Sequence, residues 1–243
     1  MVNNPANPPI ATLLNSVRGA LKKAVDANYV GQAKADDAYE AYLFSLVVQA
    51  AVSEGAASPP QFQDAKLNPT ADLVFRRGPG RIAATSTRLF THAVLDFSNA
   101  PALEVHLGVL VNGKAPVVMG HEFDICVLPQ EEAKRCRSRD SSGKSRNPAS
   151  SKVFMMVECK YYPQAKPLEV AVAASFRGVT DDLTTKYCFF AVTAMEPAAE
   201  KFLGKFTDKI GHGVVPPTSA NYAATQFRSQ LQNAFHQYTR AYL

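Results

Sequence analysis

Apolar residues recur at helical spacing over the first part of the chain. Residues 10–25 place several of them on one face, which predicts an amphipathic helix built on Ile10, Leu13, Leu14, Val17, Leu21 and Val25. Residues 35–53 are apolar on most sides, so a second helix is predicted there and is expected to be buried. Residues 1–9 are polar and rich in proline, which favours a flexible arm, and residues 54–70 have the composition of a loop.

After residue 70 the apolar residues come in short runs rich in β-branched and aromatic side chains, which is typical of buried strands. These runs predict strands over residues 91–97, 102–111, 121–128, 153–162 and 187–193. The dipeptide Asn112-Gly113 is a turn signal, so the second and third of these strands are expected to form a hairpin. Helical patterns return over residues 167–183 and 221–242.

This order of elements predicts an α/β fold in which helices flank a central mixed β-sheet. The 243 residues are enough for one large domain, which we expect to span residues 10–243 after the arm at 1–9. Within that domain we expect a core at about residues 36–195, a loop at 134–152 and a C-terminal helical extension at 196–243.

Two of the predicted strands carry charged residues where apolar ones are expected. Asp124 lies in His-Glu-Phe-Asp-Ile-Cys-Val-Leu, and Glu158 and Lys160 lie in Val-Phe-Met-Met-Val-Glu-Cys-Lys-Tyr-Tyr. Because side chains alternate along a strand, Glu158 and Lys160 project from the same side. Burying such charges without partners is costly. If the two strands pair, three charged groups meet in one patch, which suits a hard divalent cation.

Glu40 lies one turn before Leu43 and Phe44 in the second predicted helix and is expected near the same patch. Two carboxylates can bind Mg²⁺ and still leave coordination positions for water and phosphate oxygens. The ion neutralises charge on the phosphate, while Lys160 can hold or help to deprotonate the attacking water, or stabilise the transition state. Glu40 can complete the metal shell or bind a second ion, so the set suits phosphodiester hydrolysis.

Asp124 followed by Glu158-Cys159-Lys160 resembles the D…(D/E)-x-K signature of the PD-(D/E)xK nuclease superfamily, which has a restriction-endonuclease-like fold. The resemblance covers about residues 36–195, and Phe123 stands where the family has a proline. It implies that Asp124 and Glu158 bind Mg²⁺ or Mn²⁺, with the backbone carbonyl of Cys159 as a further ligand. It also implies that Lys160 positions the water and that Glu40 joins from the preceding helix. Dimers and effectors of prokaryotic antiviral defence occur in the family, so a homodimer or a protein partner supplying target choice is an expectation here.

Residues 134–152 carry seven basic side chains against one acid and connect the two acidic strands. Their serines, glycine and proline predict a loop. Its position favours contacts with a nucleic acid, more readily DNA than RNA, although a solvated loop is the simpler interpretation. A net charge of +5 permits such a partner. The residues expected to make these contacts are Arg135, Arg137, Arg139, Lys144 and Arg146.

The cysteines have no metal-binding spacing and are expected to be reduced and structural, which suggests a cytoplasmic protein. They are Cys126, Cys136, Cys159 and Cys188. The N-terminus does not have the pattern of a signal peptide, and the longest apolar run is too short to span a bilayer. We therefore expect no membrane contact.

Simpler structural interpretations stand beside these. E-x-K triplets arise by chance and can be exposed ion pairs at a strand end, and Glu40 can be an ordinary surface residue of a helix. His121 and Glu122 lie beside Asp124 and can support the metal or the scissile phosphate, but a strand-end histidine in a polar turn is the simpler expectation. Glu104 and His106 share one strand face and are expected to be solvated, with a metal role left open.

The leading hypothesis is a metal-dependent nuclease that acts on DNA. Three alternatives remain: a catalytically silent nucleic-acid-binding module or scaffold with the same fold, an RNA nuclease, and a metal-dependent enzyme for another phosphate ester. A pure binder should show no Mg²⁺- or Mn²⁺-linked gain in thermal stability, which separates it from the enzymes.

Overall fold

The computed structural model describes residues 10–83, 89–114, 120–138, 145–162, 165–207, 210–216 and 222–243. Its strands are β1 (Ala24–Val25), β2 (Gln61–Gln63), β3 (Asp72–Leu73), β4 (His92–Leu95), β5 (Leu103–Asn112), β6 (Gly120–Pro129), β7 (Met155–Lys160), β8 (Tyr187–Val192) and β9 (Ile210–Val214). Its α-helices are α1 (Ile10–Leu21), α2 (Ala27–Gln32), α3 (Ala35–Ser53), α4 (Gln130–Arg137), α5 (Val170–Asp181), α6 (Pro197–Leu203) and α7 (Tyr222–Arg240). The arm predicted at residues 1–9 lies outside the described residues.

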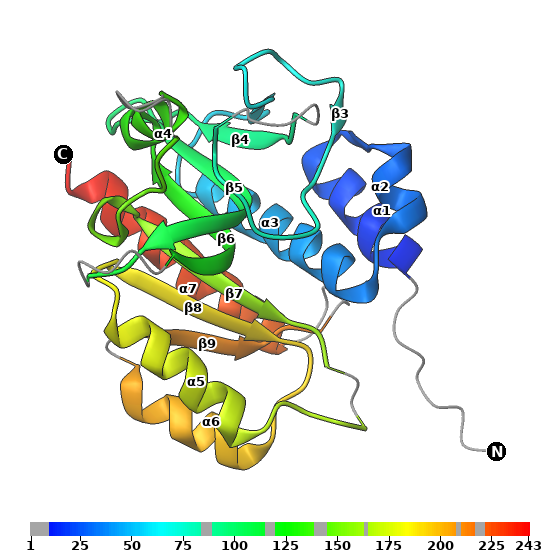
Figure 1. Ribbon diagram of the computed structural model, residues 1–243, viewed down its shortest axis with the longest axis vertical. Coiled ribbons are helices and arrows are strands. Elements are labelled where there is room, and N and C mark those ends of the chain that lie inside the picture. The colour runs from blue at the N-terminus through cyan, green and yellow to red at the C-terminus, as the bar shows by residue number, and fades with distance from the viewer. Residues whose placement is uncertain are drawn as a thin grey trace.

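Seven strands form one mixed sheet in the order β2-β4-β5-β6-β7-β8-β9, and helices cover both of its faces (Figure 1). Strands β2, β4, β5, β6 and β7 pair in antiparallel fashion, whereas β7, β8 and β9 are parallel. Strands β1 and β3 form a separate parallel pair. The parallel strands are connected by crossovers that contain α5 and α6. The predicted α/β fold with a central mixed sheet is therefore confirmed. None of the described helices has the length and apolar character needed to cross a membrane.

The two acidic strands lie side by side in this sheet. β5 and β6 form the expected hairpin, with Asn112 opposite Gly120. β6 then pairs with β7, with Ile125 opposite Val157. This confirms the pairing on which the convergence of the three charges depends.

Helix α3 is buried on nearly every side because it lies between α1, α7 and the sheet. Its boundaries match the predicted 35–53. The side chain of Asp37 accepts a hydrogen bond from the Lys34 backbone N–H at 2.7 Å, which satisfies a donor at the start of the helix. Tyr39 and Phe44 are among its fully buried side chains, and burying each contributes roughly 1.5–3 kcal/mol. This rigid helix fixes the position of Glu40.

Several elements differ from the sequence-based expectations. The first helix ends at Leu21, because Lys22 takes a left-handed conformation with φ 53°, and Ala24–Val25 forms β1 instead. Strand β2 lies within the segment expected to be a loop. Strand β9 lies within the expected helical extension and forms the edge of the sheet beside β8, so the sheet continues beyond residue 195. In the sequence, the glycines of β9 suggest a loop. In the structure, glycine is needed at residue 211 because an added Cβ would stand 2.4 Å from the ring of Phe189.

The predicted loop at 134–152 begins instead as the second half of helix α4. Lys134 contacts Glu131 at 2.6 Å, and Arg135 contacts Glu132 at 2.5 Å, one turn earlier in the helix. Each such i,i+3 pair stabilises a helix by about 0.2–0.5 kcal/mol. The loop prediction was wrong here because it weighed the basic residues without the two glutamates that precede them.

A left-handed glycine shapes β5 opposite Asp124. Gly108 has φ 58°, and a Cβ on it would stand 2.7 Å from the carbonyl oxygen of Gly78. The ladder pairs on either side of it are Leu107 with Ile125 and Val109 with Phe123. The first pair packs in the core beneath α3 and the second in the core beneath α5, so the strand pair changes faces at this point. Gly108 thus sets the local geometry in which Asp124 is held.

We expect Gly108→Ala to lower the free energy of unfolding by at least about 1–2 kcal/mol, the cost of a left-handed residue with a Cβ, before the steric clash is added. Urea unfolding measures the change. Gly19→Ala is the matched control, because Gly19 lies in α1 with no atom within 4 Å of an added Cβ. The control should gain about 0.5–1 kcal/mol. Equal effects of the two substitutions would contradict the assigned role of Gly108.

Candidate active site

The site begins where strands β6 and β7 stop pairing. The last pair of their ladder is Ile125 with Val157, and Asp124 and Glu158 are the adjacent residues just beyond it. Beyond that point the carboxylate of Asp124 takes the place of a ladder carbonyl: its Oδ2 accepts the backbone N–H of Cys159 at 2.6 Å. The divergence of the strands leaves room for a ligand, and this hydrogen bond fixes the Asp124 carboxylate at its edge.

Glu158 and Lys160 lie on the same side of β7, as strand alternation requires. Lys160 Nζ is 2.6 Å from Glu158 Oε1 and 3.8 Å from Asp124 Oδ2. Asp124 is 7% exposed, whereas the Lys160 side chain is 38% exposed. The three charged groups therefore form one cluster that is buried at Asp124 and open to solvent at the ammonium group.

Helix α3 closes the cluster from the side of the sheet that it covers. Glu40 lines the same cavity as Asp124, Glu158 and Lys160, and the cavity volume is about 440 Å³. Two further acids also line it: Glu122, which was considered as a support for the metal or the phosphate, and Asp36, which was not considered. Asp36 lies one turn before Glu40, and this helical spacing is the signal that could have found it. The remaining lining residues are Cys159, Tyr161 and Tyr162.

The carboxyl groups of this cavity hold their protons more tightly than usual. Burial, with repulsion from Asp124, raises the pKa of Glu40 to about 9 and that of Glu158 to about 7. Burial also raises the pKa of Asp124, although Lys160 and the Cys159 N–H oppose the shift. Burial disfavours the Lys160 ammonium, but Asp124 and Glu158 outweigh it and raise the Lys160 pKa. One ammonium group therefore does not balance the acids around it.

This imbalance fits a divalent cation. An ion among Asp124, Glu158 and Glu40 would relieve the repulsion that raises their pKa values, and carboxylate oxygens are the ligands that Mg²⁺ prefers. The Cys159 carbonyl suits the same position. Lys160 C=O accepts from Thr193 N–H toward β8, and neighbouring carbonyls of a strand point to opposite sides, so the Cys159 carbonyl faces β6 and Asp124.

The raised pKa values predict a pH dependence of stability. Glu40 and Glu158 bind protons more tightly in the folded than in the unfolded chain, whose carboxyl pKa is about 4.3. Their stabilising contribution is complete below that pH and is lost as the pH rises through about 7 and about 9. In EDTA, the melting temperature of the wild type should fall over this range more steeply than that of Glu40→Gln. Parallel curves for the two proteins would contradict the assignment.

His121 does not lie in a simple polar turn. Its Nε2 is 2.8 Å from Oδ2 of Asp182, at the end of α5. The same imidazole lines a second cavity of about 170 Å³, which Glu122, Glu158 and Lys160 also line. The acidic site is therefore bordered by cavities on two sides, one toward α3 and one toward α5.

The expected nucleic-acid contacts are only partly available. Arg137 is buried against Glu104, and its side chain is only 11% exposed, so we withdraw it from this set. Arg135 remains partly exposed, but its charge is compensated by Glu132. Arg146 is exposed. Arg139 and Lys144 lie outside the described residues.

The expectation that Glu104 and His106 are solvated was wrong. Glu104 is fully buried and His106 is 8% exposed. Arg137 from α4 covers them, and His92 from β4 lies beside them. The sequence pattern of this strand could not reveal the covering helix, because the residues of that helix were assigned to a loop.

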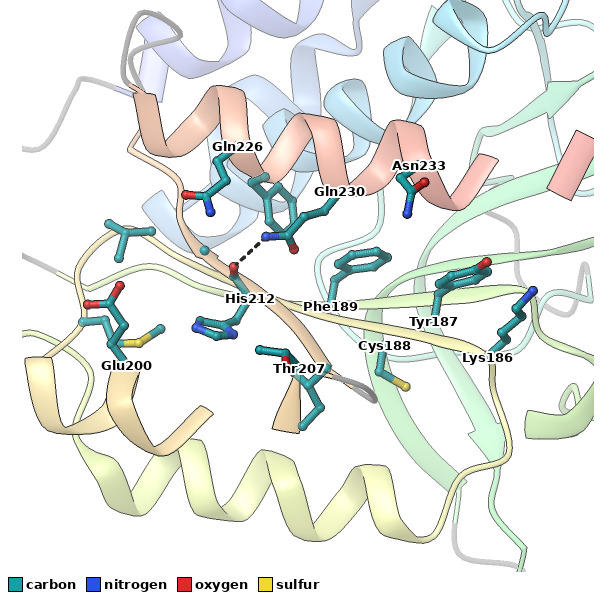
Figure 2. Close-up of a pocket in the computed structure, with 16 residues that line it drawn as sticks. Lys186, Tyr187, Cys188, Phe189, Glu200, Thr207, His212, Gln226, Gln230 and Asn233 are labelled. Atoms are coloured by element: carbon teal, nitrogen blue, oxygen red, sulfur yellow. Dashed lines mark hydrogen bonds between the residues drawn. The ribbon is translucent and has the colours of Figure 1, made fainter. Parts of the chain in front are cut away.

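A further cavity, of about 530 Å³, lies along edge strand β9 and helix α7. Figure 2 shows Gln226, Gln230 and Asn233 on one side of β9 and Glu200 and His212 on the other. Gln230 Nε2 donates to the His212 carbonyl at 3.3 Å (Figure 2). The lining of this cavity includes Glu200 and His212 but no cluster of carboxylates, so we take the acidic cavity, where several charges meet, as the candidate active site.

Comparisons of the chain with protein-family models, with curated proteins and with solved structures found no match. Its chemistry therefore has to be inferred from the site itself.

Proposed function

We propose that this protein is a metal-dependent nuclease of the PD-(D/E)xK type, which hydrolyses phosphodiester bonds at the acidic cavity between β6, β7 and α3. The observation that carries the proposal is the convergence of Asp124, Glu158 and Lys160 where two paired strands diverge. Glu40 reaches the same cavity from a helix earlier in the chain.

The arrangement of elements supports the same proposal. The acidic strands β6 and β7 are adjacent and antiparallel, and α5 then leads to β8, which is parallel to β7. This is the order that the family resemblance implies for a restriction-endonuclease-like core. β9 adds a strand at the edge of the sheet beside β8, and α7 packs against β9 and α3 (Figure 1).

Mg²⁺ or Mn²⁺ held by Asp124, Glu158 and the Cys159 carbonyl would supply charge neutralisation at the phosphate and activation of water. Lys160 keeps its proton, because the neighbouring carboxylates raise its pKa. It therefore acts as a hydrogen-bond donor that orients the water or stabilises charge on the phosphate, rather than as the base. Glu40 and Glu122 line the same cavity. A bound cation would lower their raised pKa values, and as carboxylates they would take up the proton released when water attacks.

DNA is the proposed substrate, because a net positive chain with a carboxylate metal site suits a polyanion. A homodimer or a protein partner, and a role in prokaryotic defence, remain predictions of the family resemblance. The described residues provide Arg146 as an exposed member of the predicted contact set.

Cleavage of a substrate panel tests the proposal. Supercoiled plasmid, circular single-stranded DNA, duplex RNA and single-stranded RNA are each incubated with wild-type protein in EDTA, Mg²⁺ or Mn²⁺. We expect metal-dependent conversion of a DNA substrate and none in EDTA. Cleavage of RNA alone would keep the enzyme class and change the substrate. No cleavage of any substrate, with no metal-linked rise in melting temperature, would leave only the binding-module interpretation.

A further inference from the structure

Three metal-ligating side chains lie together on one face of two paired strands, away from the acidic residues described above. Ala93 on β4 pairs with Val105 on β5, which brings His92 next to His106. Glu104 and His106 are two residues apart and therefore share a strand face. The three are 1%, 0% and 8% exposed, in the order His92, Glu104, His106. The sheet thus holds them in place without the help of a loop.

Their ligand atoms have the spacing of a metal site. Glu104 Oε2 is 2.9 Å from His106 Nε2 and 3.5 Å from His92 Nε2, and all three atoms lie within 4.8 Å of one another. Ligands about 2.0–2.1 Å from a tetrahedral Zn²⁺ ion are separated by roughly 3.3 Å. The two measured distances from Glu104 lie on either side of that value. A small cavity lined by His92, His106, Arg76 and Phe90 adjoins the group.

A cationic side chain meets the same ligand atoms. Arg137 Nη1 donates to Glu104 Oε1 at 3.0 Å, and Arg137 Nη2 donates to Glu104 Oε2. Arg137 Nη2 is also 3.2 Å from His92 Nε2. The guanidinium therefore contacts two of the three atoms that a metal ion would bind. It comes from the last residue of α4, where a helix end can open without unfolding the sheet.

We propose that His92, Glu104 and His106 form a binding site for a transition-metal ion of the Zn²⁺ class, and that the metal ion and the Arg137 guanidinium compete for the same position. Two imidazoles and one carboxylate suit Zn²⁺ better than Mg²⁺, which prefers oxygen ligands. Three protein ligands leave the fourth tetrahedral position open. The site is independent of the proposed nuclease chemistry, because it shares no residue with the acidic cavity.

Competition gives a test that separates a metal site from a plain ion-pair network. Arg137→Ala removes the competing cation and leaves the three ligands in place. In excess Mg²⁺, which occupies oxygen-ligand sites, this variant should bind one equivalent of Zn²⁺ at least about tenfold more tightly than the wild type. In the same excess of Mg²⁺, added Zn²⁺ should raise the melting temperature of this variant further. With Co²⁺ as a probe, the variant should show the strong visible absorption of a four-coordinate ion.

Removing one ligand is the control. The double variant Arg137→Ala/His106→Ala should lose the tight Zn²⁺ binding and the Co²⁺ absorption. If Arg137→Ala is too unstable to purify, the wild type and His106→Ala are titrated with Co²⁺ instead, and only the wild type should give the four-coordinate spectrum. Equal Zn²⁺ and Co²⁺ binding with and without His106, in either pair, would overturn the inference and leave the group as a structural ion-pair network.

Discussion

Lys160→Ala is expected to lower the single-turnover cleavage rate by about 10²–10³-fold, the usual cost of removing one preorganised charge-stabilising donor. Asp124→Asn should lower it by about 10³-fold or more, because the loss of a metal-binding carboxylate removes several kcal/mol of transition-state stabilisation. The asparagine keeps an oxygen that can accept the Cys159 N–H, so the strand ends should stay in place. Quench-flow or gel-based cleavage under enzyme excess measures both rates.

Lys134→Ala is the matched control for this prediction. Lys134 is an exposed lysine that pairs with Glu131 on helix α4 and does not line the acidic cavity. It should cleave at the wild-type rate. All variants should keep the wild-type circular dichroism spectrum. Wild-type rates from both Lys160→Ala and Asp124→Asn would show that cleavage takes place elsewhere.

The second large effect concerns stability. Arg137→Ala should lower the free energy of unfolding by about 3–5 kcal/mol, because it leaves a fully buried carboxylate without its charged partner. Burial favours the neutral acid, but His106 and Arg137 outweigh it and lower the pKa of Glu104 to about 2. Glu104 is therefore ionised at neutral pH and depends on the guanidinium. Urea unfolding in EDTA measures the loss.

The control for this effect is again Lys134→Ala, in which both partners of the ion pair are exposed. Its loss should be at most about 0.5 kcal/mol. Equal stability of Arg137→Ala and Lys134→Ala would mean that Glu104 is balanced by another group or carries a proton. The comparison also separates a structural from a substrate-binding role for this arginine, since a surface contact to DNA would not affect unfolding.

The regular elements could be predicted from the sequence where one periodicity dominated. Helix α3 has apolar residues on most sides and was placed with its observed boundaries. The strands that carry Asp124 and Glu158 could be predicted because each is a short apolar run rich in β-branched or aromatic residues. The Asn112-Gly113 turn predicted the hairpin of β5 and β6, whereas the pairing of β6 with β7 entered the sequence analysis only as a condition, which the structure fulfils. The prediction of four charged groups in one cavity needed only these elements.

The remaining parts depended on tertiary contacts that a local pattern does not encode. β9 has two glycines because aromatic rings pack closely against them: an added Cβ would stand 2.4 Å from Phe189 at Gly211 and 3.2 Å from Phe227 at Gly213. The second half of helix α4 was predicted to be a loop because the prediction considered its basic residues alone. It overlooked the glutamates one turn earlier that pair with them. The group of His92, Glu104 and His106 becomes visible only when the β4–β5 register and the covering helix are known.

Asp36 and Glu122 lie at the candidate active site on elements that were predicted, α3 for Asp36 and β6 for Glu122. Glu122 was considered as a support for the metal or the phosphate, whereas Asp36 was not considered. The divergence of β6 from β7, which opens the cavity that both residues line, could not be predicted from the sequence. Ladder ends depend on backbone twist and on residues such as Gly108 in the neighbouring strand, and not on the composition of the strands that diverge.

The most direct test of the central claim is cleavage of supercoiled plasmid by wild-type protein and by Lys160→Ala, prepared in the same way and each assayed with Mg²⁺ and with EDTA. The site described here predicts nicked or linear product from the wild type with Mg²⁺, none from the wild type in EDTA, and at most trace product from Lys160→Ala. Equal cleavage by the two proteins, or cleavage by the wild type that persists in EDTA, would contradict a metal-dependent nuclease site built on Asp124, Glu158 and Lys160.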